Sequence, residues 1–594
     1  MISHINKRDG SVIEKLFSTA MIGFIFSNLV TAIGPTVDGI IVGSYYSVES
    51  VAAIGLTSFL LVGYRTIAAS VISRGAHVIS SRHMGSGDKE GANQVFSLSV
   101  VLSLLISVLL AAISICFSQY IAVFLGARGA SSYLLDPTSD YLIGYCVGLP
   151  FYTATVILTP YLQMDGDYNR VTTASIAMTV VDILADLYVV KVLHGGLLQI
   201  GLATSLGHLV SFLIIVSHFV FKKSNFRFSL KGIRFSQSLD IFQSGAATGI
   251  VKLSNTFCGI LINNMLAVFA TGGAIAVFSV GNSIVKTCFS FWLGPANTLM
   301  SFTSMFFGEE DRNALRTVQK IAVGKGLKLT CAVTAVVFIL AGPIATIYLR
   351  NADANTLVMA RESIRFFAIS MPFNVLIYCF QLYLIGAGRR AFANLYSMLL
   401  DFAIPVSVTA LMLVMAGYHG AWLAKPLINL LAVLVAWVYI RRQPGEGFAN
   451  KALLIPEGFG VASGRELCFA ADSIEDIRGV SGIAIAFAME NGADKKQANI
   501  FSLAVEELAG NIAEHGFSDG HPHHLDIRML KKDDQLILRF RDDCRRFDPV
   551  EKYRTELQYA DDPERGIGIR MMMKLAKEIN YTGMYGMNNL IIRI

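Results

Sequence analysis

The sequence predicts an all-α polytopic membrane protein followed by a small α+β domain. Three observations predict this fold class. The 594-residue chain has a mean hydropathy of +0.55 and only 15% charged residues, whereas an ordinary soluble protein carries about 25%. Up to about residue 441 the apolar residues form long runs with few charges, and from about residue 443 the composition is that of a soluble protein. A polar helix at 503–517, LAVEELAGNIAEHGF, lies in this second part.

The apolar runs predict twelve transmembrane helices, because a span needs about 20 mostly apolar residues. Twelve stretches satisfy this condition: 14–34, 51–73, 94–115, 139–160, 171–192, 197–221, 240–266, 274–300, 321–345, 362–386, 394–416 and 420–440. Six of them form a first lobe over 1–222 and six form a second lobe over 240–441, joined by a basic loop at 223–239. A linker with two prolines and several glycines follows at 442–463, and the soluble domain occupies 464–594.

The basic residues indicate the orientation in the membrane. Most of those in short loops fall on one side, for example Arg82 and Lys89 after the second span and Arg389 and Arg390 after the tenth. Cytoplasmic loops carry such an excess, so we expect both termini and the soluble domain in the cytoplasm, and the chain in the cytoplasmic (inner) membrane of a bacterium. Topology therefore explains the net charge of +6 without a nucleic-acid partner. The eight cysteines include no CxxC pair, and no removable signal peptide is expected.

The two predicted lobes share short motifs. The loop after the second span reads GSGDKEGA (85–92), and the loop after the eighth reads GEEDRNA (308–314). The fourth span of each half is followed by YLQMDGDYNR (161–170) or YLIGAGRRAF (383–392). Duplicated halves that face a central cavity are the architecture of many secondary transporters.

Ionisable residues inside the predicted spans are candidate functional residues, because a charge in the hydrocarbon is costly. Asp38 lies in or at the end of the first span, and Asp182 and Asp186 lie four residues apart in the fifth, on one helix face. These three are the candidates for binding a coupling ion or the substrate. Asp186 and the other intramembrane charges could instead reach an interface or form structural pairs; these others are Lys252, Lys286, Asp401 and Lys425.

The stretch PTVDGIIVGSYYSVESVAAIG, with the GSGDKEGA loop and the glycine-rich turn after the fourth span, resembles the multidrug and toxic compound extrusion (MATE) transporters. The resemblance covers residues 10 to about 441. It implies a twelve-helix, two-lobed antiporter that exchanges H⁺ or Na⁺ for organic, often cationic, compounds. Asp38 falls on the carboxylate of the family's first helix, and Asp182 falls near the acidic position of the fifth. The seventh and tenth spans lack the acids that some members use, so the resemblance favours the first lobe.

The tail has the periodicity of an α+β domain of about 130 residues. We expect a strand at 464–472, helices at 473–492 and 497–516, a hairpin at 525–543, a turn into a helix over 565–582 and a last strand at 585–594.

Five residues of the tail are spaced for nucleotide chemistry. Glu507 and Asn511 lie four apart on one helix face, where a carboxylate and a carboxamide can position a nucleophile and coordinate Mg²⁺. Asp542 closes a strand, and its carboxylate could accept a hydrogen bond from the amino group of a base. Gly566 and Gly568, in RGIGI, lie at a helix N-terminus, which attracts phosphate.

This set, with RDDCRRFDP (541–549), resembles the GHKL ATP-binding fold, and most closely the anti-sigma-factor serine kinases. The resemblance covers about 464–594 and implies ATP and Mg²⁺ as cofactors. It makes Glu507 the base and Asn511 the Mg²⁺ ligand; Asp542 reads adenine, and the two glycines line the phosphates. An anti-anti-sigma-like or other regulatory protein is the implied partner.

Two details of the tail qualify this resemblance. Cys544 stands where the family has glycine, so its side chain could crowd the adenine pocket. The run HPHH (521–524) has a spacing that suits no standard metal site.

Taken together, the residues and the two resemblances favour an ion-gradient-driven antiporter that exports organic, possibly cationic, compounds across the cytoplasmic membrane and is regulated by its ATP-binding tail. Its expected partners are a small organic substrate and membrane lipid. The absence of a G-x-x-x-x-G-K-[ST] motif disfavours primary ATP-driven pumping. Two alternatives stay open: a membrane sensor whose tail acts as a serine kinase, and a lipid or glycan flippase.

Overall fold

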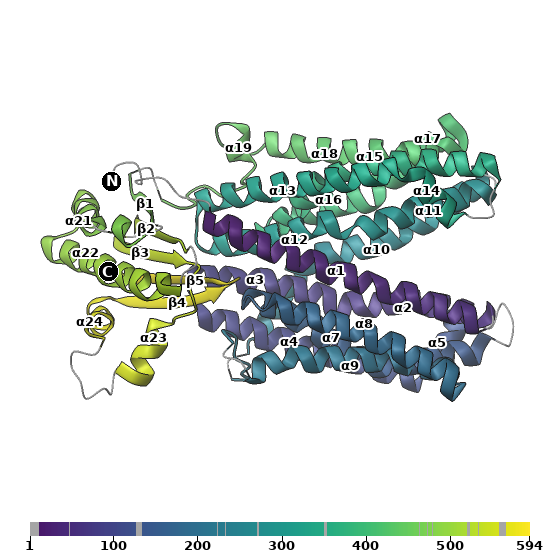
Figure 1. The fold of residues 1–594 in the computed structure, drawn as a ribbon, viewed down its shortest axis with the longest axis horizontal. Helices are drawn as coiled ribbons and strands as arrows, with labels where there is room; N and C mark the ends of the chain where they lie inside the picture. The colour runs from purple at the N-terminus through teal and green to yellow at the C-terminus, as the bar shows by residue number, and fades with distance from the viewer. Residues whose placement is uncertain are drawn as a thin grey trace.

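The structure, a computed structural model, contains two bundles of helices with a helix-covered sheet at one end (Figure 1). We call the first bundle, residues 11–221, the N-lobe and the second, 235–441, the C-lobe. The end that contacts the sheet is the tail end, and the opposite end is the far end. The described residues are 11–46, 48–125, 127, 134–221, 224–231, 233–269, 272–349, 353–461, 464–471, 473–477, 479–519, 523–532, 534–557 and 566–594.

The described elements of the N-lobe are helices joined by short turns. Its elements are α1 (Ser11–Tyr45), α2 (Val48–Arg65), η2 (Thr66–Val71), α3 (Ile72–Ser86), α4 (Lys89–Cys116), α5 (Ser118–Phe124), α7 (Leu135–Met164), α8 (Tyr168–Tyr188), η4 (Val189–Leu193) and α9 (Leu197–Phe221). Helix α1 packs both on α8 and on α12 of the C-lobe, so it joins the two bundles.

The C-lobe repeats this plan. Its elements are η5 (Phe235–Gln237), α10 (Ser238–Phe269), α11 (Gly272–Cys288), α12 (Ser290–Gly308), α13 (Arg312–Ile339), α14 (Ala341–Tyr348), α15 (Ala354–Gly386), α16 (Arg390–Met398), η6 (Leu399–Ala403), α17 (Ile404–Ala416), η7 (Gly417–His419) and α18 (Gly420–Arg441).

Every predicted span lies within one of these helices or within a run of adjoining helices. In the part of the chain that the structure describes, nine helical segments are long and apolar enough to cross a membrane. The last of these, 390–441, contains the final two predicted spans. The predicted fold class, a polytopic helical protein with a small α+β domain, is therefore confirmed.

The loops of the sequence repeat have the same structure in both lobes. Asp88 caps α4 by accepting a hydrogen bond from the Gly91 amide (2.8 Å). Asp311 caps α13 by accepting one from the Ala314 amide (2.9 Å). A carboxylate at this position satisfies an amide that the helix leaves without a partner, and it lies at the positive end of the helix dipole.

Two glycines of the same loops let the lobes cross closely at the tail end. A Cβ atom on Gly85 would lie 2.1 Å from the Met305 carbonyl oxygen, and one on Gly308 would lie 2.1 Å from the Arg82 carbonyl oxygen. These contacts are reciprocal: Gly85 of the N-lobe meets the backbone just before Gly308, and Gly308 of the C-lobe meets the backbone just before Gly85. The crossing of α3 and α12 therefore has the symmetry of the repeat and admits only glycine.

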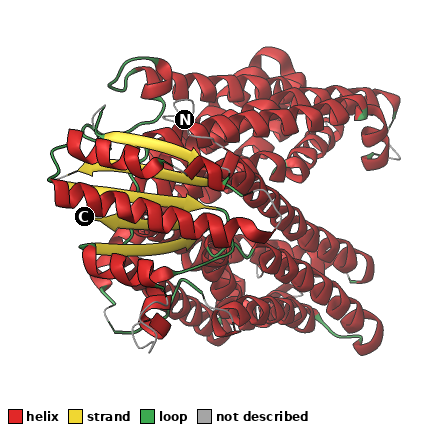
Figure 2. Ribbon diagram, turned by 60° about the vertical axis from the view of Figure 1, so that its left-hand side comes forward, coloured by secondary structure: helices red, strands yellow, loops and turns green. Residues whose placement is uncertain are grey.

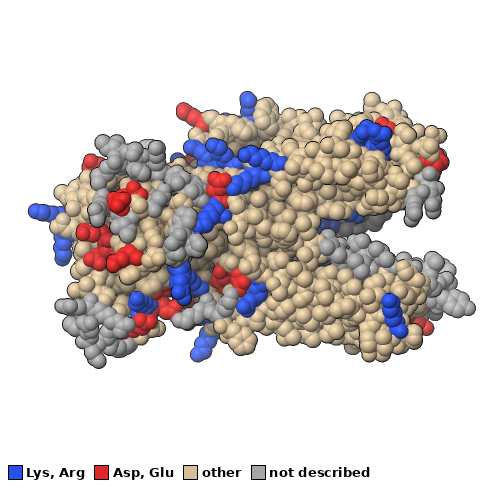
Figure 3. All heavy atoms as spheres, viewed as in Figure 1, with Lys and Arg blue, Asp and Glu red and all other residues tan. Residues whose placement is uncertain are grey.

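The surface differs between the two ends. Figure 3 shows Lys and Arg gathered where the lobes meet the tail, whereas most of the surface farther from the tail carries few charges. On the same face, the molecule is hollowed between the lobes at the far end. The lobes thus meet at the tail end and separate at the far end.

The tail is a five-stranded antiparallel sheet in the order β1-β2-β3-β5-β4, with helices on one face (Figure 2). Its elements, after α19 (Phe448–Lys451) of the linker, are β1 (Glu466–Ala471), α20 (Ile474–Ile477), α21 (Val480–Glu490), α22 (Lys495–Gly516), η8 (Phe517–Asp519), β2 (Leu525–Lys532), β3 (Gln535–Asp542), α23 (Pro549–Lys552), η9 (Tyr553–Leu557), α24 (Ile567–Leu575), β4 (Glu578–Met584) and β5 (Met587–Arg593).

One predicted element of the tail is wrong in its extent. The helix expected over 565–582 ends at Leu575, and the following residues form β4. The alternation of Ile579 and Tyr581, which pack on the core of the tail, is a strand period that the helical reading overlooked. A tight turn at Tyr585 and Gly586 then joins β4 to β5.

The linker lies against the C-lobe. The Tyr383 hydroxyl donates to the Leu453 carbonyl (2.6 Å), and the Arg389 guanidinium donates twice to the Leu454 carbonyl (2.7 and 3.0 Å). Arg312 donates to the Phe459 carbonyl (2.8 Å). The tail is therefore anchored to the C-lobe before its first strand begins.

Candidate functional site

The acidic candidates of the N-lobe lie one turn apart on α8. Asp182 is 6% exposed and Asp186 is fully buried. Among the described residues, Oδ1 of Asp182 has no hydrogen-bond partner. Burial of a carboxylate oxygen without a partner is costly, so a proton or a cation would stabilise this position. Asp38 belongs to α1, but its side chain lies outside the described part of the structure.

The C-lobe contributes a buried acid that the sequence reasoning did not favour. Asp401 is 4% exposed and accepts hydrogen bonds from Asn255 (3.2 Å) and Gln381 (3.3 Å). It lies in η6, a π-helical turn, and such turns occur frequently at functional sites. The sequence shows Asp401 as an acid inside an apolar span. Its amide partners, Asn255 and Gln381, belong to helices that only the fold brings next to it.

The region between the lobes also contains cations. Lys252 of α10 donates to Ser70 of the N-lobe (2.5 Å), and Arg74 of α3 donates to Asn297 of α12 (3.0 Å). Arg65 lies 4.8 Å from the ring centroid of Tyr145. Lys252 and Arg74 thus bring positive charge between the lobes, and the charge class of a substrate does not follow from the acids alone.

The tail brings its base and glycine candidates together. Glu507 lies half-buried on α22, and a Cβ atom on Gly568 would lie 1.9 Å from its Oε2 atom. Gly566 caps α24 with φ of +63°, a conformation that glycine adopts without strain. The start of α24 can therefore approach α22 only because position 568 is glycine. The amides at this helix start lie beside Glu507, and a helix N-terminus favours anions.

Asn511 follows Glu507 by one turn of α22 and is also half-buried. Asp494 begins this helix with a capping box, in which its side chain and that of Gln497 each bind the other's backbone amide. The residues fit a bound Mg²⁺–nucleotide: Asn511 would hold the metal, and the glycines would face the phosphates.

Asp542 ends β3 and lies in a buried polar network. It is 4% exposed and accepts hydrogen bonds from the Asn588 side chain (2.7 Å) and the Cys544 amide (3.0 Å). The Tyr581 hydroxyl fixes Asn588 from the other side (2.6 Å). Burial raises the pKa of Asp542 to about 6, although these hydrogen bonds oppose the shift.

Cys544 lies between this network and α22. A Cβ atom on Gly516 would lie 2.6 Å from the Cys544 sulfur, so the thiol fills the space beside the C-terminal end of α22. The structure therefore places a side chain where the sequence raised the question of crowding, close to both Asp542 and the turn of α22 that follows Asn511.

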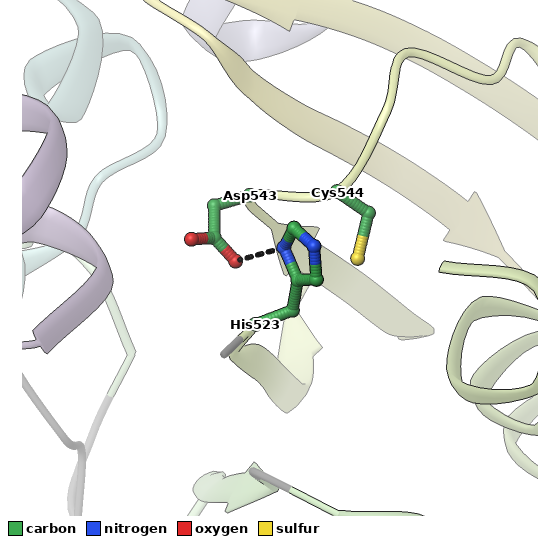
Figure 4. A group of neighbouring side chains, drawn as sticks. All are labelled: His523, Asp543 and Cys544. Atoms are coloured by element: carbon green, nitrogen blue, oxygen red, sulfur yellow. Dashed lines mark hydrogen bonds and ion pairs between the residues drawn. The ribbon is translucent and has the colours of Figure 1, made fainter. Parts of the chain in front are cut away.

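His523, Asp543 and Cys544 form a group of potential metal ligands, with their ligand atoms within 4.8 Å of one another (Figure 4). Asp543 is already engaged: it lies 3.3 Å from His523, accepts from the His524 amide (2.9 Å) and pairs with Lys15 of α1 (2.7 Å). Burial would raise the pKa of Asp543, but Lys15 and these hydrogen bonds hold it below its usual value. Lys15 thus supplies the positive charge that a metal ion would bring.

Two lobes built from one repeat, with buried carboxylates and a closed tail end, define a secondary transporter; the tail adds a nucleotide-binding fold. The MatE family model matches residues 24–187 and 247–409, which is more than half of the chain, and the chain belongs to this family. The histidine kinase-like ATPase domain model matches residues 470–594. The protein is therefore a MATE multidrug efflux family transporter with a histidine kinase-like ATPase domain.

Individual relatives are distant. The multidrug export protein MepA of Staphylococcus haemolyticus is 22% identical over 315 residues, which are 52% of this chain and 68% of that protein. MepA of Staphylococcus saprophyticus is 22% identical over 367 residues, which are 60% and 79% of the two chains.

Solved structures show the same fold for the lobes. A crystal structure of a MATE protein in complex with MaL6 has a TM-score of 0.67 at 20% identity and covers 72% of this chain and 95% of its own. A multidrug resistance MATE transporter in an outward-facing conformation has a TM-score of 0.66 at 20% identity and covers 73% and 98%.

Proposed function

We propose that the chain is an antiporter that uses a gradient of H⁺ or Na⁺ to export organic compounds across the bacterial cytoplasmic membrane, and that nucleotide binding to its cytoplasmic tail regulates it. The observation that carries the transport proposal is the buried pair Asp182 and Asp186 on α8. Export of multiple drugs by the MepA relatives supports an organic substrate.

The acids can couple ion and substrate because they are costly to bury while charged. A proton or Na⁺ that binds Asp182 from the far side removes this cost and favours the change of access, and its release on the other side restores the charge. Asp38, by its place in α1, is proposed to belong to the same set. The far-end hollow and the crossing at Gly85 and Gly308 then correspond to one of the two states of alternating access.

The distribution of charge supports a cytoplasmic tail. Lys and Arg gather at the tail end (Figure 3), as expected for the cytoplasmic side of a membrane protein. In the tail, Glu507 is proposed as the base, Asn511 as the Mg²⁺ ligand and Asp542 as the adenine reader. Gly566 and Gly568 would bind the phosphates. Bound ATP would supply a phosphoryl group for hydrolysis or for transfer to a regulatory protein.

Vesicles that contain the purified protein test the transport proposal. We expect an imposed pH or Na⁺ gradient to drive transport of ethidium, a cationic probe, without ATP. Transport of fluorescein, an anionic probe, is measured in parallel to compare the two charge classes of substrate. Asp182→Asn and Asp38→Asn should each abolish coupled transport while the protein still inserts, because the amide keeps the shape and cannot titrate. Asp136, an exposed acid in the first turn of α7, offers the matched control Asp136→Asn, which should transport normally. Gradient-driven transport by both acid variants would refute the assignment.

A further inference from the structure

The face of the sheet that carries no helices is docked on buried acids of the C-lobe, chiefly Glu309, with Asp311 lying 3.8 Å from Arg541. Glu309 follows α12 and is 5% exposed. Its Oε2 atom accepts from Arg539 (3.1 Å) and from Arg541, and its Oε1 atom accepts from Asn589 (3.1 Å). Arg528 donates one hydrogen bond to the Glu309 carbonyl (3.2 Å) and one to the Glu310 carbonyl (3.3 Å). Side chains alternate between the two faces of the sheet, and these polar side chains of β2, β3 and β5 lie on the face without helices. That face therefore binds the lobe and not solvent.

The same sheet covers the equivalent loop of the N-lobe. A Cβ atom on Gly87 would lie 3.3 Å from the Asn580 side chain and 3.4 Å from Ile591. Gly87 belongs to GSGDKEGA, whereas Glu309 belongs to GEEDRNA. The two copies of the repeat thus contact one rigid sheet, and the sheet spans the junction of the lobes.

The turn between β4 and β5 enters this junction. Tyr585 is 1% exposed, and its hydroxyl lies 3.0 Å from Nε2 of His77 and 3.1 Å from Oγ of Ser81, both on α3 of the N-lobe. Its ring stacks on Phe302 of α12 in the C-lobe, with 5.0 Å between centroids. Its amide donates to the Met164 carbonyl at the end of α7 (2.5 Å). One side chain therefore holds both lobes.

The backbone of Tyr585 is strained, which indicates that these contacts are strong. Its φ is +55°, and the φ of Gly586 is +82°; such turns favour Asn or Gly, and an aromatic residue is disfavoured. A residue persists in such a conformation only where its surroundings fix it, and such residues cluster at functional positions.

The loop beside the nucleotide site docks on the same region. Asp543 pairs with Lys15 of α1 (2.7 Å), and Arg546 donates to Asn225 of the loop between the lobes (2.6 Å). Asn225 in turn donates to the Gly583 carbonyl of β4 (2.5 Å). Asn588 of β5 joins the loop to the hairpin by donating both to Asp542 (2.7 Å) and to the Cys544 carbonyl (3.2 Å).

We propose that residues 542–546 and the β4–β5 hairpin (578–593) form a clamp that holds the two lobes together at the tail end, and that nucleotide binding releases it. This inference rests on the proposed nucleotide site and names its regulation. The linker and Glu309 anchor the tail to the C-lobe, and the clamp supplies its hold on the N-lobe. While the clamp is closed, the lobes cannot separate at the tail end, and the transporter stays open only at the far end.

The direction of the coupling follows from Cys544. A base that reaches Asp542 needs the space between loop 542–546 and α22, which the thiol now fills. The loop must therefore move when a nucleotide binds, and the contacts of Asp543 with Lys15 and of Arg546 with Asn225 move with it. Linkage is reciprocal, so a closed clamp weakens nucleotide binding, and an opened clamp strengthens it.

Substitution of the turn residue tests the proposal in the full chain. Tyr585→Gly removes the ring and hydroxyl but suits the positive φ, so the hairpin keeps its turn. Asp534→Gly is the matched control: Asp534 also has a positive φ (+60°) in a hairpin turn, but its side chain is fully exposed and contacts no lobe. Tyr585→Phe retains the ring and loses only the hydroxyl contacts.

Two quantities are measured in lipid nanodiscs. The first is the affinity for AMP-PNP with Mg²⁺. The second is the distance between spin labels at Glu90 and Lys320, which are exposed near the starts of α4 and α13, with the exposed Cys116 and Cys331 replaced by serine. We expect Tyr585→Gly to bind the nucleotide about tenfold more tightly, within the usual range of coupling, and to show a longer label distance without nucleotide. Tyr585→Phe should lie between it and the wild type, and Asp534→Gly should match the wild type.

The failures are distinguishable. Equal affinity in the wild type, Tyr585→Gly and Asp534→Gly would overturn the clamp and leave the proposed nucleotide site standing. Absence of AMP-PNP binding in all of them, and in Cys544→Gly, would overturn both. A label distance that stays constant in Tyr585→Gly and on nucleotide addition would also overturn the clamp.

Discussion

Asp542 is the residue at which the proposed nucleotide site and the docking network meet. Its carboxylate accepts hydrogen bonds from Asn588 and from the Cys544 amide, and these partners connect it to the hairpin and to the docked loop. Because burial raises its pKa to about 6, its protonation state changes within a pH range that binding experiments can reach.

Nucleotide affinity should therefore depend on pH through Asp542. Only the ionised form is a full acceptor for the amino group of adenine, so lowering the pH from 7 to 5 should weaken AMP-PNP binding by about tenfold, since one unit below a pKa leaves about a tenth ionised. Asp542→Asn should lack this tenfold change in affinity, because its amide does not titrate. Titration of the phosphates is common to both proteins, so the difference between their pH profiles isolates Asp542. Parallel profiles would contradict the assignment.

The raised pKa of Asp542 affects folding stability in the opposite direction from nucleotide binding. The folded-state pKa lies above the ordinary value of about 3.9, so the folded tail takes up a proton more readily than the unfolded chain. The contribution of Asp542 to stability is fully present below about pH 4 and is lost as the pH rises through 6. Low pH therefore favours the folded network while it disfavours nucleotide binding.

At the scale of the element, the sheet shows how far the sequence was informative. The alternation in β2 and β3 predicted a hairpin at 525–543, and the structure has it. Alternation distinguishes an apolar face from a polar one, but it does not tell whether the polar face meets water or a complementary surface. The burial of Arg528, Arg539 and Arg541 against Glu309 therefore needed the fold. The helix expected beyond Leu575 was wrong because local helix formers outweighed a short strand period.

The same reasoning applies to the candidate residues. Spacing along a helix placed Glu507 and Asn511 together, because one turn fixes their relation. The approach of Gly568 to Glu507 and of Cys544 to Gly516 depends on tertiary packing, which the sequence could suggest only through the resemblance. Asp401 and its amide partners depend likewise on helices that are distant in the chain.

Glu309 should be the main energetic contact of the sheet with the lobes. Glu309→Gln removes the acid that pairs with buried Arg539 (3.1 Å), whereas Arg541 keeps Asp311 at 3.8 Å. Breaking a buried pair such as Arg539–Glu309 costs about 3–5 kcal/mol. Burial already lowers the pKa of Arg539 to about 10, and Glu309 opposes that shift. Glu310→Gln is the adjacent control: Glu310 pairs with Lys532 (2.7 Å), but both side chains are more than a third exposed, so its loss should cost at most about 1 kcal/mol.

Hydrogen exchange of the β2 and β3 amides in the full chain measures this difference as a local free energy of opening. We expect faster exchange in Glu309→Gln and near wild-type exchange in Glu310→Gln. Similar exchange in both variants would show that the sheet is held by its own fold and that the docked acid adds little.

At the scale of the whole molecule, the internal repeat relates the two lobes by their contacts as well as by their sequence. Asp88 and Asp311 cap equivalent helices, and Gly85 and Gly308 meet the backbone of the opposite lobe at the same distance, 2.1 Å. The tail has no such repeat. It therefore adds an asymmetric contact to a symmetric junction, and this is the contact through which we propose that the tail influences which end of the transporter is open.

Substitution of Gly85 or Gly308 by alanine should open the junction of the lobes to the same extent. Real Cβ atoms essentially never lie within 3.0 Å of a backbone atom, so Gly85→Ala or Gly308→Ala forces α3 and α12 apart at the tail end. Overpacking costs roughly 1–3 kcal/mol, which corresponds to about a five- to 150-fold loss of the state with a closed tail end. Gly324→Ala is the control, because a Cβ atom on this glycine of α13 meets nothing within 4 Å.

The label distance between Glu90 and Lys320 and the rate of gradient-driven transport measure the outcome. Both alanine variants should lengthen the distance and slow transport to similar extents, because the repeat makes the two positions equivalent, while Gly324→Ala should behave as the wild type. The double variant should add little, since a junction opened at one glycine no longer confines the other. An effect of Gly85→Ala without an effect of Gly308→Ala would contradict a symmetric junction. The contacts of the tail with the N-lobe would then be the ones that matter for its influence on the junction.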